Sequence, residues 1–127
     1  MYDDLIARLI PELITPKTPE NYYHTYQSYV CMLDLDRLKI PDIETGGGFR
    51  NQLLQKLEDI GIATRQGTHA VHMLDYYKNR FHYKAEDCMN AYACDHLSIT
   101  LPLYITMTDD DQVYVVQMIR KLLDERQ

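Results

Sequence analysis

The segment from His24 to Leu33 constrains the fold more than any other part of this chain. It is rich in aromatic and β-branched residues, among them Tyr26, Tyr29 and Val30, and such residues favour extended strands. Its apolar side chains fall on both faces, which is typical of a strand that is covered on two sides. The sequence therefore predicts a central strand over residues 24–33, with other elements packed around it.

Most other apolar residues recur at the spacing of amphipathic helices. This spacing predicts helices over residues 3–14, 49–60, 72–80 and 86–97, and from residue 108 onward. Pro11 should kink or end the first helix, and Gly61 is a natural stop for the second. Thr108 can cap the free amides of the last one.

Short extended segments are predicted at residues 62–66 and 98–101, and Pro102 should end the latter. A small sheet covered by helices is the packing that these elements favour. The length of 127 residues suits one domain. Because the helices have little sheet to cover, we expect an incomplete unit that docks on another.

Charge and composition exclude several classes of partner. The formal charge is −6 and no basic cluster is present, so a nucleic-acid partner is not expected. No apolar run is long enough to cross a bilayer, and the acidic start is unlike a secretory signal, so no membrane partner is expected. The odd, widely spaced cysteines favour reduced thiols and a cytoplasmic location.

The triplet Gly46–Gly48 allows two interpretations. Glycines can let backbone amides approach a phosphate group. However, neither a Gly-Lys-Ser/Thr nor a G-x-G-x-x-G pattern accompanies them. We therefore interpret the triplet as a flexible loop before the helix at 49–60.

The densest polar cluster lies between Thr64 and His72 and includes Arg65, Gln66 and His69. Arginine can clamp a carboxylate or phosphate through two points, and histidine can exchange protons near neutral pH. Such residues after a strand suit a functional loop. The alternative is a polar loop whose side chains cap helix ends and one another.

A metal site and a nucleophilic site find less support in the sequence. His69 and His72 could share an ion with Cys88, Cys94 or His96. No recognised spacing completes that ligand set, so no metal is expected. A G-x-S-x-G motif is absent, and no cysteine has a histidine at a telling position.

Three patterns follow one another along nearly the whole chain. They are HTYQSYV at 24–30, GIATRQGTHAVH at 61–72 with Tyr76 and Tyr77 beyond it, and LPLY at 101–104 followed by MTDDDQ at 107–112. In order and spacing they resemble the C-terminal part of the DegT-like family of sugar aminotransferases. This resemblance implies an α+β fold of two layers, with a small, mainly antiparallel sheet of about three strands covered by helices, as in the small domain of fold-type-I aminotransferases.

The resemblance also implies a function for residues 1–127 as a single C-terminal small domain. Enzymes of this family use pyridoxal phosphate, work as dimers and move an amino group from glutamate to a keto-sugar nucleotide. Their Schiff-base lysine lies in a large domain, which would precede residue 1. We therefore expect this chain alone to hold no catalytic residue and to bind no pyridoxal phosphate.

By the same resemblance, the small domain supplies the outer wall of the active-site cleft and part of the subunit contact. Arg65 and His69 would hold an anionic group of the substrate, and His72 would orient the loop or touch the substrate. Tyr26 and Gln27 would line the same edge. The alternative is a stand-alone protein-binding module that retains this fold and uses its docking surface for another partner.

Overall fold

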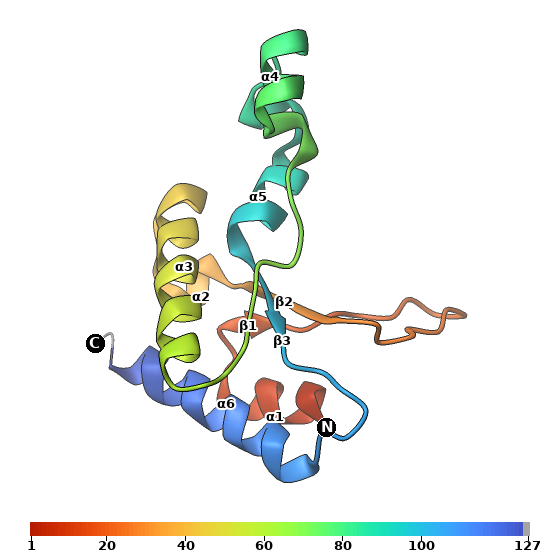
Figure 1. The fold of residues 1–127 in the computed structure, drawn as a ribbon, viewed down its shortest axis with the longest axis vertical. Helices are drawn as coiled ribbons and strands as arrows, with labels where there is room; N and C mark the ends of the chain where they lie inside the picture. Colours follow the sequence, from red (N-terminus) through yellow and green to blue (C-terminus); the bar gives the residue numbers. More distant parts are fainter. Residues whose placement is uncertain (126–127) are drawn as a thin grey trace.

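A computed structural model of the chain describes residues 1–125, and these form an α+β fold (Figure 1). The sheet has the order β1-β2-β3, with β1 at Leu13–Ile14, β2 at Tyr29–Leu33 and β3 at Ser98–Leu101. Both pairings are antiparallel. The predicted fold class, the small antiparallel sheet and the strand at 98–101 are confirmed.

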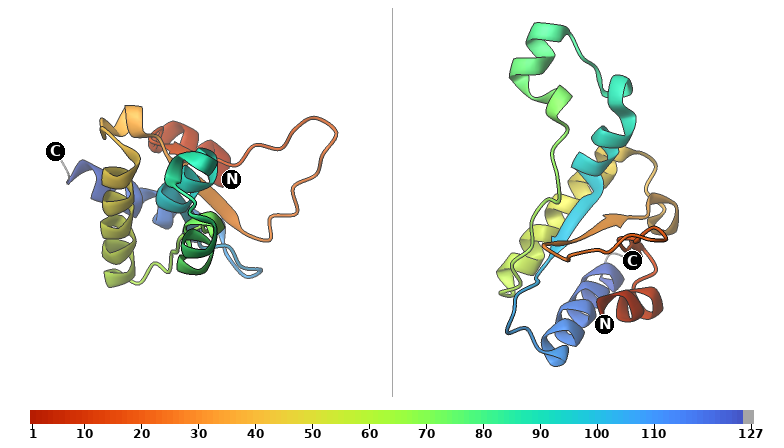
Figure 2. Two further views of the ribbon diagram at one scale, coloured as in Figure 1. Left: turned by 90° about the horizontal axis from the view of Figure 1, so that it is seen from above. Right: turned by 90° about the vertical axis from the view of Figure 1, so that its right-hand side faces the viewer.

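The central strand β2 is shorter than the sequence predicts. It starts at Tyr29, which pairs with Leu101 at the end of β3. The next residue of the partner strand is Pro102, which has no N–H to continue the ladder. Residues 24–28 therefore remain outside the sheet and belong to a long excursion between β1 and β2 (Figure 2).

The first helix also ends earlier than its apolar stripe suggests. Helix α1 spans Tyr2–Leu9, and the chain turns at Pro11 and Glu12, where the Leu13 amide donates to the Ile10 carbonyl at 3.0 Å, in line with the predicted early end. Leu13, predicted at the end of the helical stripe, instead pairs with Leu33 as part of β1. Leu13 is buried there, whereas Leu9 is 40% exposed.

The interpretation of Gly46–Gly48 as a flexible loop is wrong. After the short helix α2 (Leu35–Leu38), helix α3 spans Ile43–Asp59 and contains all three glycines. Asp42 caps α3, because its side chain accepts a hydrogen bond from the Thr45 amide at 2.7 Å. A Cβ on Gly46 would lie 2.6 Å from a Leu97 methyl carbon, and one on Gly47 would lie 2.8 Å from the His96 ring. These two glycines therefore let α3 pack closely against the end of α5.

Part of the segment between α3 and β3, around α4, projects away from the sheet (Figures 1 and 2). It contains two 3₁₀ turns, Val71–Met73 and Ala85–Cys88, and the helices α4 (Asp75–Phe81) and α5 (Met89–Leu97). The predicted helices at 72–80 and 86–97 thus each begin with a 3₁₀ turn. We call residues 71–88 the arm.

The last helix, α6, spans Asp109–Asp124 and packs beside α1 below the sheet (Figure 1). The predicted Thr108 cap is confirmed, and Asp111 completes a reciprocal capping box. The Arg120 guanidinium binds the Glu12 carboxylate at 2.8 Å. The core joins one face of the sheet to these helices through residues such as Ile6, Cys31, Ile99 and Ile119.

Candidate functional site

Arg65 and Gln27 lie together in a cleft of about 270 Å³. The cleft lies where β2 begins, where β3 ends and where residues 63–65 pass beside β3. We call it the arginine cleft. Among the described residues that line it, Arg65 is the one with a charge. The cleft is therefore a cationic spot on a chain whose formal charge is −6.

The backbone of Arg65 is held while its side chain is left available. Arg65 and Thr100 form a β-bridge in which the Thr100 amide donates to the Arg65 carbonyl at 2.7 Å. Within residues 1–125, the Arg65 guanidinium makes no hydrogen bond or ion pair, and the residue is exposed. The buried hydroxyl oxygen of Thr64, another lining residue, also has no partner there. A fixed arginine without a partner suits an anionic ligand.

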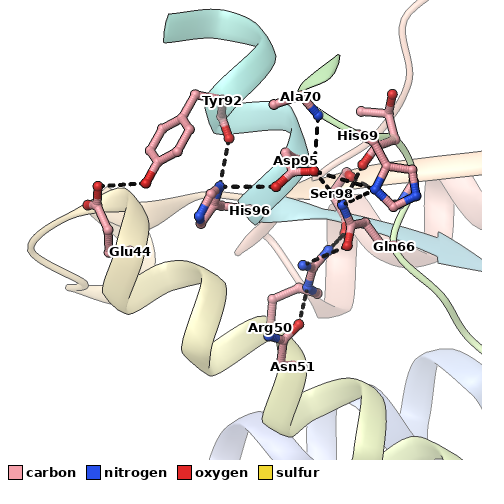
Figure 3. A network of polar contacts seen from close by, with 12 residues as sticks. Glu44, Arg50, Asn51, Gln66, His69, Ala70, Tyr92, Asp95, His96 and Ser98 are labelled. Atoms are coloured by element: carbon pink, nitrogen blue, oxygen red, sulfur yellow. Dashed lines mark hydrogen bonds and ion pairs between the residues drawn. The ribbon is translucent and has the colours of Figure 1, made fainter. Parts of the chain in front are cut away.

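The loop that follows Arg65 is held by a polar network, which Figure 3 shows. Gln66 donates from Nε2 to Oδ1 of Asp95 at 2.7 Å, and the Ala70 amide donates to the same oxygen at 3.0 Å. The Gly67 amide donates to the Ser98 hydroxyl at 3.0 Å. Asp95 on α5 therefore binds both ends of the loop and limits its movement.

Arg50 connects this network to α3 from the interior of the protein. It is 4% exposed, and its guanidinium donates to the Ser98 carbonyl at 2.9 Å and to the Gln66 side-chain oxygen at 3.3 Å. Burial lowers the pKa of Arg50, an effect that the nearby Asp95 carboxylate opposes. Since arginine still carries its proton at neutral pH, Arg50 and Asp95 form a positive and a negative anchor for Gln66.

The two histidines of the predicted site lie apart from the arginine cleft. His69 is exposed and belongs to the Gln66–Asp95 network, with its Nδ1 3.1 Å from Gln66 Nε2 and 3.6 Å from Asp95 Oδ1. His72 is 8% exposed and meets the edge of the Tyr83 ring, with ring centroids 6.3 Å apart. Its buried Nε2 has no partner within the described residues. Its position at the base of the arm suits a role in orienting that segment.

Tyr26 lines a different cavity from its neighbour Gln27, one that also contains Tyr2, Tyr29 and Asp3. Its φ is 51°, a left-handed conformation that is rare for a bulky residue and recurs at functional sites. The Tyr26 amide donates to Nδ1 of His24 at 2.9 Å, and its ring stacks on Tyr29. The two cavities meet at Leu103, which lines both.

The residues of the arginine cleft do not fit pyridoxal phosphate. A Schiff base requires a lysine amine, and none of the described residues that line this cleft is a lysine. Lys17 lines another cavity, beside Asp34 and Arg37, where no aromatic ring could cover the cofactor. Within residues 1–125, no group of three His, Cys, Asp or Glu side chains could hold a metal ion. In the same part of the chain, no helix is long and apolar enough to span a membrane.

Sequence reasoning missed Arg50 and Asp95, although one of them carried a signal. Arg50 stands three residues before Leu53 and seven before Leu57, so it falls on the apolar face of α3. A charged residue on a buried face must be paired, and this predicts an internal network. Asp95 carried no such signal, because α5 has only a weak apolar face.

Comparisons with known proteins agree with this architecture. The sequence profile of the DegT/DnrJ/EryC1/StrS aminotransferase family matches residues 2–120. The chain is 32% identical over 113 residues to a protein of Methanocaldococcus jannaschii, covering 89% of this chain and 27% of that protein. It is 31% identical over 115 residues to the spore coat polysaccharide biosynthesis protein SpsC of Bacillus subtilis, covering 90% and 28%.

A solved structure with the same fold is a putative sugar aminotransferase from Streptococcus pneumoniae in its PLP-form. The TM-score is 0.76 at 21% sequence identity, over 98% of this chain and 29% of that one. At this level of identity the match shows the fold alone. The chain therefore spans less than a third of the length of the relatives that it matches.

Proposed function

Because the chain belongs to the DegT/DnrJ/EryC1/StrS aminotransferase family, we propose that it is the C-terminal small domain of a pyridoxal-phosphate-dependent enzyme. That enzyme would transfer an amino group to a keto-sugar nucleotide in the cytoplasm. The three free cysteines suit a reducing compartment. The small domain supplies one wall of the substrate cleft, and the lysine and cofactor belong to a large domain that lies outside this sequence.

One observation carries the proposal: Arg65, whose guanidinium has no hydrogen-bond or ion-pair partner among the described residues, lies in a cleft whose backbone is held in place. The diphosphate of a sugar nucleotide presents anionic oxygens that a guanidinium binds with charge-assisted hydrogen bonds. Gln27 and Ser28, which line the cleft beside Arg65, offer donors and acceptors for sugar hydroxyls. The Gln66–Asp95 network keeps this wall in shape, so little conformational entropy of the loop is lost when a ligand binds.

The arm supplies a surface for the large domain. Six large apolar side chains on it are exposed: Val71, Leu74, Tyr76, Tyr77, Phe81 and Tyr83. Their rings contact one another, with centroids 5.1 Å apart for Tyr76 and Tyr77 and 5.7 Å apart for Phe81 and Tyr83. A continuous exposed aromatic cluster of this kind marks a protein interface. We assign it to the large domain of the same enzyme or of its dimer partner.

Replacing Arg65 tests the cleft. We expect Arg65→Met to weaken binding of a nucleoside diphosphate sugar by about tenfold or more, because a charged hydrogen bond contributes roughly 1.5–3 kcal/mol. Arg8→Met is the matched control, since Arg8 is an exposed arginine on α1 whose side chain, within residues 1–125, donates a hydrogen bond only to the Asp4 carbonyl. Isothermal titration of both variants with UDP-glucose and GDP-mannose provides the measurement. Equal loss in the two variants would contradict a specific role for Arg65.

Titration with pyridoxal phosphate and borohydride reduction test the division of labour between domains. We expect that reduction will not label one particular lysine of the folded chain. The reason is that none of the described residues that line the arginine cleft is a lysine. Specific labelling of one lysine, found by peptide mass spectrometry, would show that this chain carries its own cofactor site.

The aromatic arm also favours a second function, that of a stand-alone protein-binding module. The two functions predict opposite results for the same two variants. If the chain is a binding module, Tyr76→Ser abolishes partner binding and Arg65→Met changes nothing that can be measured. If it is an enzyme domain, nucleotide-sugar binding depends on Arg65 and is unaffected by Tyr76→Ser.

A further inference from the structure

The backbone of Tyr26 is left-handed without any of the usual local reasons. Four of the described residues other than glycine have a positive φ: Asn21, Tyr26, Lys39 and His82. Lys39 and His82 each follow the last residue of a helix, α2 and α4, where this conformation is common. Asparagine tolerates it through its short polar side chain. Tyr26 ends no helix and is bulky, so other contacts must offset the strain of its φ of 51°.

This turn of the backbone changes which side chains share a face. In a regular strand, neighbouring side chains point to opposite sides. Tyr26 would then lie opposite Tyr29, and the adjacent Gln27 and Ser28 could not share a side. Instead, residues 27–28 form a bend, and the Tyr26 ring stacks on Tyr29 with centroids 6.2 Å apart and planes 13° apart. Gln27 and Ser28 both line the arginine cleft, so the left-handed turn at Tyr26 brings these two polar residues to one side.

Aromatic contacts hold this turn in place. The Tyr26 amide donates to Nδ1 of His24 at 2.9 Å, and the centroids of the two rings lie 4.3 Å apart. Tyr29, on which Tyr26 stacks, is buried, and its ring contacts that of Tyr2 with centroids 5.0 Å apart. The Tyr29 hydroxyl donates to the Asp3 carboxylate on α1. Burial first, and then this hydrogen bond, raise the pKa of Tyr29, so its phenol keeps the proton and the stack rests on a fixed ring.

We propose that Tyr26 is a positioning residue of the arginine cleft. Its stacked ring keeps its backbone left-handed and thereby holds Gln27 and Ser28 toward the ligand. Through these two residues it makes the cleft favour a nucleotide sugar over the nucleotide alone. Arg65 binds the diphosphate without this help, because its backbone is held by its own bridge to Thr100. This inference rests on the proposed function, which supplies the sugar nucleotide.

The test replaces Tyr26 by three residues and measures the binding of UDP-glucose and of UDP by isothermal titration. Phenylalanine keeps the stack, asparagine tolerates a left-handed backbone without a ring, and alanine does neither. We expect Tyr26→Ala to weaken UDP-glucose about threefold to tenfold, the loss of one or two neutral hydrogen bonds, and to leave UDP almost unchanged. Tyr26→Phe should retain the affinity of the original chain for UDP-glucose, and Tyr26→Asn should fall between the other two variants.

Two controls separate positioning from other roles of Tyr26. Tyr23→Ala is the matched control, since Tyr23 lies on the same excursion, is 89% exposed and is not among the described residues that line either cavity. It should leave both affinities unchanged. In a chain that already carries Gln27→Ala, Tyr26→Ala should weaken UDP-glucose less than it does alone, because Tyr26 acts partly through Gln27.

The outcomes separate this inference from the proposed function. If Tyr26→Asn and Tyr26→Ala lose the same affinity, or if Tyr26→Ala weakens UDP as much as UDP-glucose, the positioning role is refuted, even when Arg65→Met weakens both ligands. If neither ligand depends on Arg65, the proposed function fails. A preference for UDP-glucose over UDP that still depends on Tyr26 would then support the positioning role alone, and its absence would refute both.

Discussion

The glycines of α3 allow a sharp test of how this helix packs, because Gly46 and Gly48 differ only in their surroundings. A Cβ added to Gly46 would lie 2.6 Å from a methyl carbon of Leu97 and 2.7 Å from one of Leu35. A Cβ added to Gly48 would meet nothing within 4 Å. Both residues lie in the interior of the same helix, so alanine brings the same gain in helix propensity at either position.

The expected free energies follow from these contacts. Gly48→Ala should stabilise the protein by about 1 kcal/mol, since glycine costs roughly that much relative to alanine within a helix. Gly46→Ala receives the same gain but must displace two packed methyl groups, and overpacking costs typically about 1–3 kcal/mol. Since both contacts are side-chain ends that can move a little, the net change should run from about zero to 2 kcal/mol of destabilisation.

Urea unfolding of the two variants followed by circular dichroism measures this difference directly. The difference between the variants isolates the packing cost, because the propensity gain cancels. If Gly46→Ala were as stable as Gly48→Ala, α3 and α5 would not approach as closely as described. Gly46 would then be free of any packing constraint.

Three further predictions concern a cap, a buried thiol and the loop network. Thr108→Ala should destabilise the protein by about 1 kcal/mol in urea unfolding, whereas Thr106→Ala in the exposed loop should change little. Burial raises the pKa of Cys31 from 9.0 to about 12, so the unfolded chain loses this proton first. The free energy of unfolding should therefore fall by up to about 1.4 kcal/mol per pH unit between these two values, and less steeply in Cys31→Ala. Arg50→Met should lower the free energy of unfolding by about 2–4 kcal/mol, because the Ser98 carbonyl and the Asp95 carboxylate lose their cation. A change as small as that caused by replacing an exposed arginine would refute the network.

Local signals predicted those elements whose ends are determined by neighbouring residues. The cap at Thr108, the end of β3 before Pro102 and the stop of α3 near Gly61 all depend on backbone chemistry within one turn of the chain. Where the prediction from the sequence was wrong, tertiary packing had determined the structure. The glycines of α3 read as a loop because their low helix propensity was visible, while the close approach of Leu97 was not. Likewise, β2 is shorter than predicted because its partner strand β3 ends at Leu101.

The residues of the candidate site also divide into those that local sequence patterns predicted and those that only tertiary packing revealed. Arg65 and Gln27 come from patterns visible in the sequence, and the structure places them in one cleft. The anchors Arg50 and Asp95 lie on different helices, α3 and α5, and are 45 residues apart in the sequence. Only the fold brings both of them to Gln66. This separation has a functional consequence. Since Arg50 and Asp95 hold the loop through contacts within residues 1–125, the arginine cleft keeps its shape in this chain by itself, and its affinity for a diphosphate can be measured on this chain.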